Sequence, residues 1–385
     1  MFPMDSNSDL SPIPLVDLQT QSQALKEEVL RRMGDVIDGA RYILGREVQE
    51  FEEIFAKYCG VDHCIGMANG TEAIHMAIRA LDIGPGDEVI TAGNSFAATA
   101  FAIAHAGADA VFVDVDPTDF NIDVGLIEQA ITERTKAIIP VHLYGQPARM
   151  REICELAKAY NLKVIEDSAQ GHGGEIDGQR CGSFGDIGCF SFYPGKNLGA
   201  FGDGGATTTK CPELAEKLRL LRNYGQRVKN RHDMLAFNSR LDTIQACVLL
   251  AKMPHLEKWT EQRRAIADWY REDLANVDII LPQARPEMRH VYHLFVIRTR
   301  HRDALIASLA KKNISCGIHY PNPLFTAQPF QNSPTIPLGL PVCSRIANEI
   351  VSLPMYPEMT REQVSRVSSS IAEFIACQEL ERATV

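Results

Sequence analysis

The sequence has no long apolar run, no clustered cysteines and no excess of positive charge, and each absence excludes a class of protein. Within its 385 residues no apolar segment approaches the roughly 18 residues that cross a bilayer. Ten cysteines are scattered without a CxxC pair or a Cys/His cluster. We therefore expect no metal site and no disulfide framework, but reduced and mostly buried thiols.

The charge balance limits the partners of the chain. Its 49 acidic and 39 basic side chains give a net charge of -10, which disfavours sequence-independent binding to nucleic acid or to an anionic membrane. The first segment, MFPMDSNSDLSPIPLVDL, has no basic residue before Lys26 and no apolar core, so it lacks the form of a secretory signal. We expect a soluble, cytoplasmic protein that holds anionic ligands at a local site.

The hydrophobic pattern predicts an α/β fold. Two segments near the start, QALKEEVLRRMGDVI and REVQEFEEIFAKYCG, have helical periodicity. From residue 63, short apolar segments (HCIGMA, EVITA, AVFVDV, KAIIPVHL, KVIED) alternate with helical stretches (GTEAIHMAIRALDI, AATAFAIAHAG, DVGLIEQAIT, RMREICELAKAYN). This alternation is typical of a mostly parallel sheet with helices on both faces, whose ligands lie beyond the carboxyl ends of the strands.

A domain boundary is expected close to Pro254. A helical pattern runs from about Arg240 to Asn276, and the proline should break or bend it. We therefore predict a large domain over 1–257, including the N-terminal helical segment, and a small C-terminal α+β domain over 258–385. The elements of the small domain are HLFVIRT, a helix over 302–312, ISCGIHY and a terminal helix from about Thr360.

Lys196 stands alone in a tract rich in glycine and aromatics, SFGDIGCFSFYPGKNLGAFGDGGATTT. A lysine without such context is usually a solvated surface charge. Here CFSFY reads as a strand, PGKN as a turn and GATTT as the next strand, so the amine follows a rigid strand end. Burial lowers the pKa of an amine and leaves part of it unprotonated, as nucleophilic attack on a carbonyl requires. The pattern is that of a Schiff-base lysine.

Asp167 ends the apolar segment KVIED, and Gln170 follows it. The carboxylate is either a solvated acid at a strand end or the partner of a protonated pyridine nitrogen, a pairing that makes pyridoxal phosphate an electron sink. Gln170 is a candidate hydrogen-bond partner for the phenolic oxygen of the same cofactor.

Gly70 and Thr71 open a helix directly after a strand, in ANGTEAIH. The amides at a helix N-terminus form a phosphate site, although Thr71 is equally well explained as an N-cap. Phe96 follows the next strand, where its ring either packs in the core or stacks on a planar cofactor. A dinucleotide fold is disfavoured because no GxGxxG follows the first strand.

Basic residues gather in LRNYGQRVKNRHDMLAFNSRLDTIQAC, in a chain that is otherwise acidic. Such a run is usually a solvated face, but beside a phosphate site it is a candidate for binding a diphosphate. Its members are Arg222, Arg227, Lys229, Arg231, His232 and Arg240.

Three motifs in order, IEDSAQGHGG, GSFGDIGCFSFYPGKNLGAFGDGGA and FNSRLDTIQA, resemble the DegT/DnrJ/StrS family of nucleotide-sugar aminotransferases. The likeness covers nearly the whole chain from PLVDLQTQ onward. It implies fold type I of the pyridoxal phosphate-dependent transferases, similar to aspartate aminotransferase, with a mixed, mostly parallel sheet in the large domain. It also implies a homodimer with sites at the subunit interface.

The resemblance assigns roles to individual residues. Lys196 matches the Schiff-base lysine and acid–base catalyst, Asp167 the partner of the pyridine nitrogen, Gln170 the contact of the phenolic oxygen and Phe96 the stacked aromatic. The phosphate ligands implied are Gly70, Thr71, Ser191 and, from the partner subunit, Asn238. The positions implied near the sugar or its diphosphate are Tyr193, Tyr224, Lys229, His319 and Tyr320.

The resemblance also implies a reaction. L-glutamate would donate its amino group, leaving as 2-oxoglutarate, and a nucleotide-linked keto sugar would accept it. The segment PVHLYGQPARM resembles relatives that act on 3-keto sugars, so we expect a dTDP-linked 3-keto-6-deoxyhexose. A 4-keto sugar or a 3-keto uronate is the alternative substrate, and a non-catalytic sensor of sugars or cofactors is the alternative of another class.

Overall fold

A seven-stranded sheet forms the centre of the computed structural model, which describes residues 11–334 and 339–383. The strand order is β1-β9-β8-β5-β4-β2-β3. Only β9 runs antiparallel to its neighbours, so the prediction of a mostly parallel sheet is confirmed. The strands are β1 (His63–Met67), β2 (Glu88–Ala92), β3 (Asp109–Val113), β4 (Thr135–Ile139), β5 (Lys163–Asp167), β8 (Ile187–Ser191) and β9 (Gly205–Thr209).

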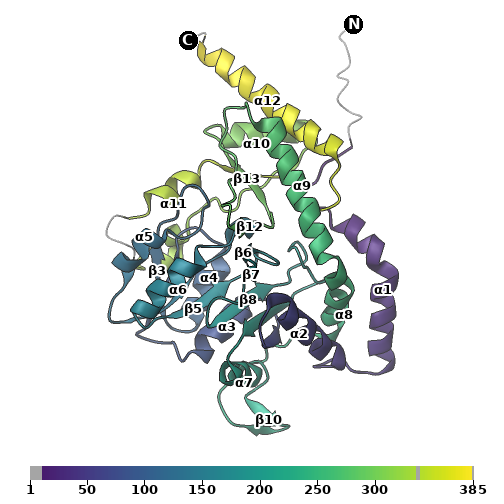
Figure 1. Ribbon diagram of the computed structural model, residues 1–385, viewed down its shortest axis with the longest axis vertical. Helices are drawn as coiled ribbons and strands as arrows, with labels where there is room; N and C mark the ends of the chain where they lie inside the picture. Colours follow the sequence, from purple (N-terminus) through teal and green to yellow (C-terminus); the bar gives the residue numbers. More distant parts are fainter. Residues whose placement is uncertain (1–10, 335–338, 384–385) are drawn as a thin grey trace.

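Helices cover both faces of this sheet (Figure 1). Neighbouring strand residues point to opposite faces, so Ile65 and Cys189 join the core under α3, whereas Cys64 and Phe190 pack against α2 and α8. The helices of this part are α1 (Leu18–Asp38), α2 (Arg46–Cys59), α3 (Gly70–Ala80), α4 (Ala97–His105), α5 (Val124–Ile127), α6 (Met150–Ala159), α7 (Pro212–Leu221) and α8 (Thr243–Lys252).

The predicted break at Pro254 is confirmed. A 3-10 turn, Met253–His255, separates α8 from the long helix α9 (Leu256–Leu274), which leads to a second core. That core contains Ile13 and the apolar faces of α9, α10 (Arg302–Lys311), α12 (Arg361–Ala383) and the pair β13 (Phe295–Arg298) and β14 (Ile350–Leu353). The remaining C-terminal helix is α11 (Pro341–Ile346). The domain boundary at residue 257 stays a prediction.

Two sequence predictions differ from the structure. The helix expected in DVGLIEQAIT is only the short α5 followed by a 3-10 turn, Glu128–Ala130. ISCGIHY forms isolated bridges and no strand, because Ile314 pairs with Ile13 and Gly317 with Ser352. These partners are far away in sequence, so local periodicity could not reveal them.

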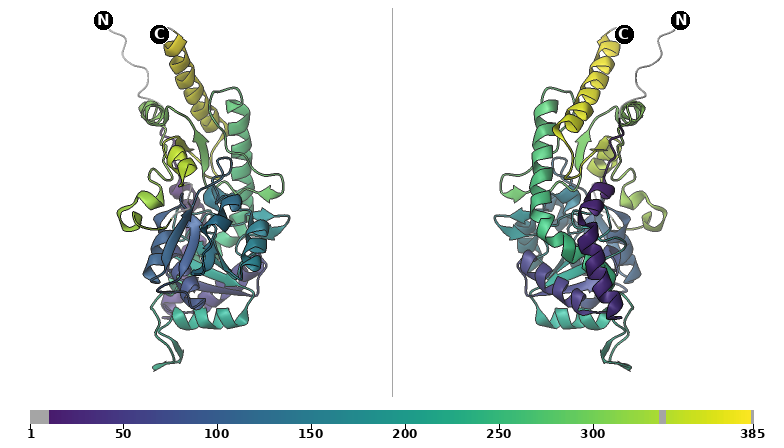
Figure 2. Two further views of the ribbon diagram at one scale, coloured as in Figure 1. Left: turned by 90° about the vertical axis from the view of Figure 1, so that its left-hand side faces the viewer. Right: turned by 90° about the vertical axis from the view of Figure 1, so that its right-hand side faces the viewer.

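Small β-structures add to the two cores. One three-stranded sheet consists of β6 (Glu175–Ile176), β7 (Gln179–Arg180) and β12 (Met288–Arg289). The hairpin of β10 (Gln226–Val228) and β11 (Arg231–His232) projects beyond α7, at the end of the molecule opposite α12 (Figures 1 and 2). All ten cysteines are free thiols. Among the helices that the structure describes, none combines the length and apolar character needed to cross a bilayer.

Candidate active site

A cavity of about 850 Å³ opens at the carboxyl edge of the central sheet. Its floor is built where strands end, because Asp167 is the last residue of β5 and Ser191 the last residue of β8. The start of α3 and the start of α4 follow β1 and β2 at the same edge. Of the predicted site residues, the cavity is lined by Gly70, Thr71, Phe96, Asp167, Gln170, Ser191, Tyr193, Lys196, His319 and Tyr320.

The loop between β8 and β9 carries Lys196 into this cavity. Helix α8 holds the loop through two side chains: Lys252 Nζ donates to Gly199 O at 2.7 Å, and Gln245 Oε1 accepts from Phe201 N at 2.9 Å. Gly199 has no room for a side chain, since a Cβ there would lie 2.3 Å from Pro194 O. The loop is therefore a rigid support for the amine.

Burial lowers the pKa of Lys196 from 10.5 to about 8, and the neighbouring carboxylate of Asp167 opposes the shift. A fraction of the amine is unprotonated at neutral pH as a result. Lys196 thus has the property that a nucleophile and proton carrier requires, and the surface-charge interpretation is disfavoured.

Asp167 is buried, with 4% of its surface exposed, and both of its oxygens are held. Thr99 Oγ1 on α4 donates to Oδ2 at 2.7 Å, and Ala169 N donates to Oδ1 at 3.1 Å. A fixed negative charge at the floor of the cavity can stabilise a protonated ring nitrogen.

Gln170 links Tyr320 in the cavity wall to the backbone of Tyr144. Its Oε1 accepts from Tyr144 N at 2.6 Å, and its Nε2 donates to Tyr320 Oη at 3.2 Å. The hydroxyl of Tyr144 donates to His319 O. The ring of Phe96 lies 5.6 Å from that of Tyr320 and is more than half exposed, so it faces the opening and is not core packing.

The start of α3 forms a cradle for an anion. The N-cap is Asn69, whose Oδ1 accepts from Glu72 N at 2.9 Å, so Thr71 is not the cap. Gly70 is required because a Cβ would lie 2.6 Å from Ser191 Cβ. The amides of Gly70 and Thr71 have no acceptor among the described residues, and together with the helix dipole they suit a phosphate.

Three predicted residues are not brought into the cavity within one chain. Tyr224 and Lys229 lie on or beside the β10–β11 hairpin, and Asn238 lies just after it. All three are exposed, and Asn238 pairs only with Asn223 in an isolated bridge. Their roles stay predictions that require a second subunit.

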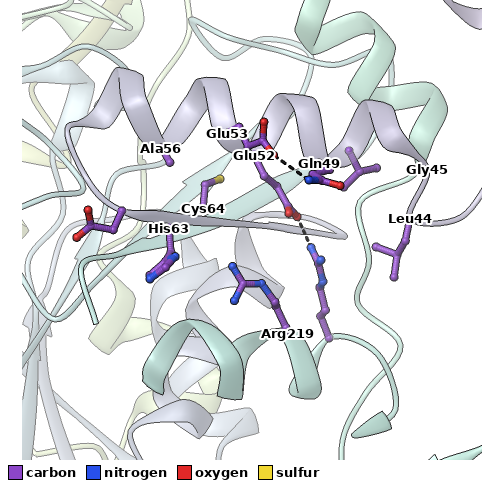
Figure 3. Close-up of a pocket in the computed structure, with 12 residues that line it drawn as sticks. Leu44, Gly45, Gln49, Glu52, Glu53, Ala56, His63, Cys64 and Arg219 are labelled. Atoms are coloured by element: carbon purple, nitrogen blue, oxygen red, sulfur yellow. Dashed lines mark hydrogen bonds and ion pairs between the residues drawn. The ribbon is translucent and has the colours of Figure 1, made fainter. Parts of the chain in front are cut away.

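The structure separates Arg222 from the other members of the basic run, and the diphosphate role of the run stays a prediction. Arg222 is buried and bonded to Glu52 and to Gly66 O, so its guanidinium is occupied within the fold. It lines a separate pocket of about 370 Å³ between α2, β1 and α7 (Figure 3). Arg240 bonds to Asn223 Oδ1, and Arg227 and Arg231 pair with Glu216 and Asp233.

Sequence reasoning missed several residues of the site. Thr99, Lys252 and Tyr144 hold Asp167, the lysine loop and Gln170 in place, yet each is distant in sequence from its partner. His293 also lines the cavity, and no motif marked it. Of these residues, only Lys252 had a feature visible in the sequence, because it is a single lysine at the end of an apolar helix.

The donor set fits pyridoxal phosphate, the group that the resemblance implies. The α3 cradle suits its phosphate, the ionised Asp167 its ring nitrogen, Gln170 its phenolic oxygen and Lys196 its aldehyde. The orphaned amides at Gly70 and Thr71 are the observation that carries this fit, because a buried donor without an acceptor is costly.

Comparison with known proteins agrees with this geometry. The model of the DegT/DnrJ/EryC1/StrS aminotransferase family matches residues 23–372. The UDP-N-acetyl-3-dehydro-alpha-D-glucosamine 3-aminotransferase of Acidithiobacillus ferrooxidans is 47% identical, over 93% of this chain and 97% of the relative. The dTDP-3-amino-3,6-dideoxy-alpha-D-galactopyranose transaminase of Aneurinibacillus thermoaerophilus is also 47% identical, over 94% and 99%.

A solved structure has the same fold. The crystal structure of S. venezuelae DesV in complex with ketimine intermediate superposes with a TM-score of 0.92 at 42% sequence identity. The match covers 95% of this chain and 99% of that chain.

Proposed function

Because this chain belongs to the DegT/DnrJ/EryC1/StrS aminotransferase family and is a pyridoxal phosphate-dependent enzyme of fold type I, we propose that it aminates carbon 3 of a nucleotide-linked keto sugar with L-glutamate. The observation that carries the proposal is Lys196, whose burial lowers the pKa of its amine to about 8, in a cavity whose floor is the carboxylate of Asp167. A lysine of lowered pKa beside a buried carboxylate is the arrangement that a transaminase requires, and it disfavours a non-catalytic sensor.

Lys196 and Asp167 have different roles in the proposed reaction. When bound, the cofactor withdraws electrons from the carbon attached to the transferred nitrogen. Lys196, once unprotonated, would take the proton from that carbon and return it to the carbon on the other side of the nitrogen. Thr99 and Ala169, which donate to its two oxygens, hold the carboxylate of Asp167 in a fixed orientation for the ring nitrogen.

The 3-keto position is supported by two relatives and by one local contact. Both 47% identical relatives carry names of carbon-3 chemistry. The segment Leu143–Gln146, on which the 3-keto prediction depended, lies under the site, where Tyr144 contacts Gln170 and His319. The hydroxyl of Tyr144, through its bond to His319 O, therefore helps to place His319 beside a bound sugar.

For the nucleotide, we favour a dTDP-linked 3-keto-6-deoxyhexose, as the sequence predicts. A UDP-linked 3-keto N-acetylglucosamine is the second candidate, because the relative from A. ferrooxidans is as similar as the dTDP-sugar enzyme. These two substrates differ in the sugar as well as the base.

The test is a panel of keto sugars incubated with L-glutamate and the loaded enzyme. It contains dTDP-linked 3-keto and 4-keto 6-deoxyhexoses, a UDP-linked 3-keto N-acetylglucosamine and a UDP-linked 3-keto uronate. We expect amination at carbon 3, assigned by NMR, with the highest kcat/KM for the dTDP sugar and no turnover by Lys196→Ala. Preference for a UDP-linked substrate would replace the proposed dTDP-linked sugar, and amination only at carbon 4 would refute the carbon-3 position.

We further propose that the site is completed by a second subunit. The projecting hairpin carries Val228, and the segment after it carries Leu235; their side chains are among the most exposed apolar groups of the described residues. A surface of this kind is typical of an interface. Docking it on a second copy would bring Asn238, Tyr224 and Lys229 to the partner's cavity.

Mixing two inactive variants tests the shared site. In a dimer of Lys196→Ala with Asn238→Ala, one site carries both changes and the other carries neither. Random exchange of subunits should restore about a quarter of wild-type activity. Mixtures that stay inactive after subunit exchange, shown by mass spectrometry of the intact dimers, would contradict the cross-subunit role.

A further inference from the structure

His293 lines the same cavity as Lys196 and has no role in the account so far. It lies between β12 and β13, in the segment that leads from the central sheet to the second core. Burial lowers the pKa of its imidazole well below the usual value, and the charges of Lys196 and Arg263 and the rings of His319 and His172 act in the same direction. The imidazole is therefore neutral at physiological pH.

Asn197, the residue after Lys196, determines which nitrogen of this neutral ring carries the hydrogen. The Nδ2 of Asn197 donates to Val291 O at 3.1 Å, which turns its Oδ1 toward His293. That oxygen lies 3.3 Å from His293 Nδ1 and can only accept. Nδ1 must therefore be the protonated nitrogen, and Nε2 carries a lone pair.

Among the described residues, the ring of His293 has its hydrogen-bond partner at Nδ1, and no donor is recorded for Nε2. The tautomer of His319 is not defined in the same way. Its Nδ1 lies 2.8 Å from the hydroxyl of Ser352, and a hydroxyl can either donate or accept. His293 is thus an imidazole with a defined acceptor in the wall of the cavity that holds Lys196.

We propose that Asn197 and His293 form a positioning pair for Lys196, in which the Nε2 lone pair of His293 accepts a hydrogen bond from the lysine ammonium. When Lys196 takes a proton from the substrate carbon, the new charge lies in a cavity where both oxygens of Asp167 already accept hydrogen bonds. A neutral acceptor stabilises that ammonium.

No proton passes to the ring in this arrangement. The low pKa of His293 keeps the proton on Nζ, so Lys196 can return it to the carbon on the far side of the transferred nitrogen. Asn197 serves the pair twice, because it follows Lys196 directly and ties the lysine loop to Val291 and His293. The inference depends on the catalytic role of Lys196 but not on the identity of the keto sugar.

Two variants separate the nitrogens of the ring. His293→Gln places an amide oxygen near the position of Nε2, whereas His293→Asn keeps only a group near Nδ1. In the half-reaction with L-glutamate alone, we expect His293→Asn to lose about 10- to 100-fold in kcat, the effect of removing one hydrogen bond to a charged group. His293→Gln should stay within about fivefold of the wild type, with little change in KM for either variant.

A matched control is His290→Asn. His290 lies on the same segment, lines no part of this cavity and uses only Nδ1, as the acceptor for Tyr292 N at 3.0 Å. Asparagine keeps an acceptor there but loses the ring stacked on Tyr292, so stability can fall while kcat should change by less than about twofold.

The deciding readout uses the apoprotein and no turnover. The pKa of Lys196 is measured from the pH dependence of its acetylation rate, followed by peptide mass spectrometry. Loss of the acceptor should lower this pKa below the value measured for the wild type in His293→Asn and leave it unchanged in His293→Gln. A Lys196 pKa in His293→Asn that is equal to or higher than that of the wild type overturns the proposal, whatever kcat shows. If His293→Asn does not fold, His293→Ser is used in its place. A wrong keto sugar would leave both readouts intact.

Discussion

Thr99 Oγ1 lies 2.7 Å from Asp167 Oδ2, and this bond joins the first turn of α4 to the end of β5. Together with Ala169 N on the other oxygen, it leaves the carboxylate one orientation. A carboxylate that is fixed before the ligand binds does not have to be ordered on binding.

Removing this hydroxyl should weaken cofactor binding without removing the charge. We expect Thr99→Val to raise the Kd for pyridoxal phosphate about tenfold, the effect of one hydrogen bond to a charged group. The measurement is a titration of apoprotein followed by absorbance. Thr99→Ser keeps the hydroxyl and should bind as the wild type does; a valine variant of unchanged Kd would show that Thr99 does not position Asp167.

The sequence predicted the parts of this site that depend on one strand and its end. Parallel strands deliver their carboxyl ends to one edge, so Asp167 and Lys196 were expected to meet there. Glu166, which precedes Asp167 on β5, points to the other face and accepts hydrogen bonds from His142 and from backbone amides. Strand alternation thus separates two adjacent acids.

What the sequence could not predict are contacts made between distant segments. Thr99 reaches Asp167, and Lys252 reaches Gly199, only after the helices pack on the sheet. Arg222 was grouped with exposed arginines because it is their neighbour in sequence, but its partner Glu52 is on α2. Periodicity reports the buried face of an element and not the element that it contacts.

Burial of the charged Lys196 should lower the free energy of unfolding of the apoprotein at neutral pH. The pKa of Lys196 is about 8 in the folded protein and 10.5 in a solvated lysine. Below pH 8 both states hold the proton, so the folded state bears the cost of burying the charge; that cost disappears as pH rises from about 8 to 10.5. We expect Lys196→Met to raise the free energy of unfolding at pH 7 by up to about 3 kcal/mol while turnover is lost.

Denaturant unfolding of the apoprotein at several pH values measures this effect. The difference between Lys196→Met and wild type should shrink between pH 8 and 10.5, where the folded lysine releases its proton first. Lys258→Met, at an exposed position of α9, should change the free energy of unfolding by less than about 0.5 kcal/mol. A Lys196→Met protein less stable than wild type at pH 7 would refute the buried-charge account.

Lys252 should matter for catalysis although it lies outside the cavity. It is 2% exposed, and its bond to Gly199 O holds the loop that carries Lys196. Lys252→Met retains the apolar stem but loses the donor, so amide hydrogens of the loop should exchange faster and kcat should fall about tenfold with little change in KM. An unchanged exchange rate in the loop would remove the positioning role; Lys258→Met is again the control.

The central claim is that the amine of Lys196, and no other, binds the cofactor covalently. Borohydride reduction of the loaded protein converts an imine into a stable secondary amine, and peptide mass spectrometry then locates the added pyridoxyl group. We predict the group on the peptide that contains Lys196, and none on Lys252, the other buried lysine with a pKa lowered to about 8. A pyridoxyl group on any other lysine, with Lys196 unmodified, would contradict the account.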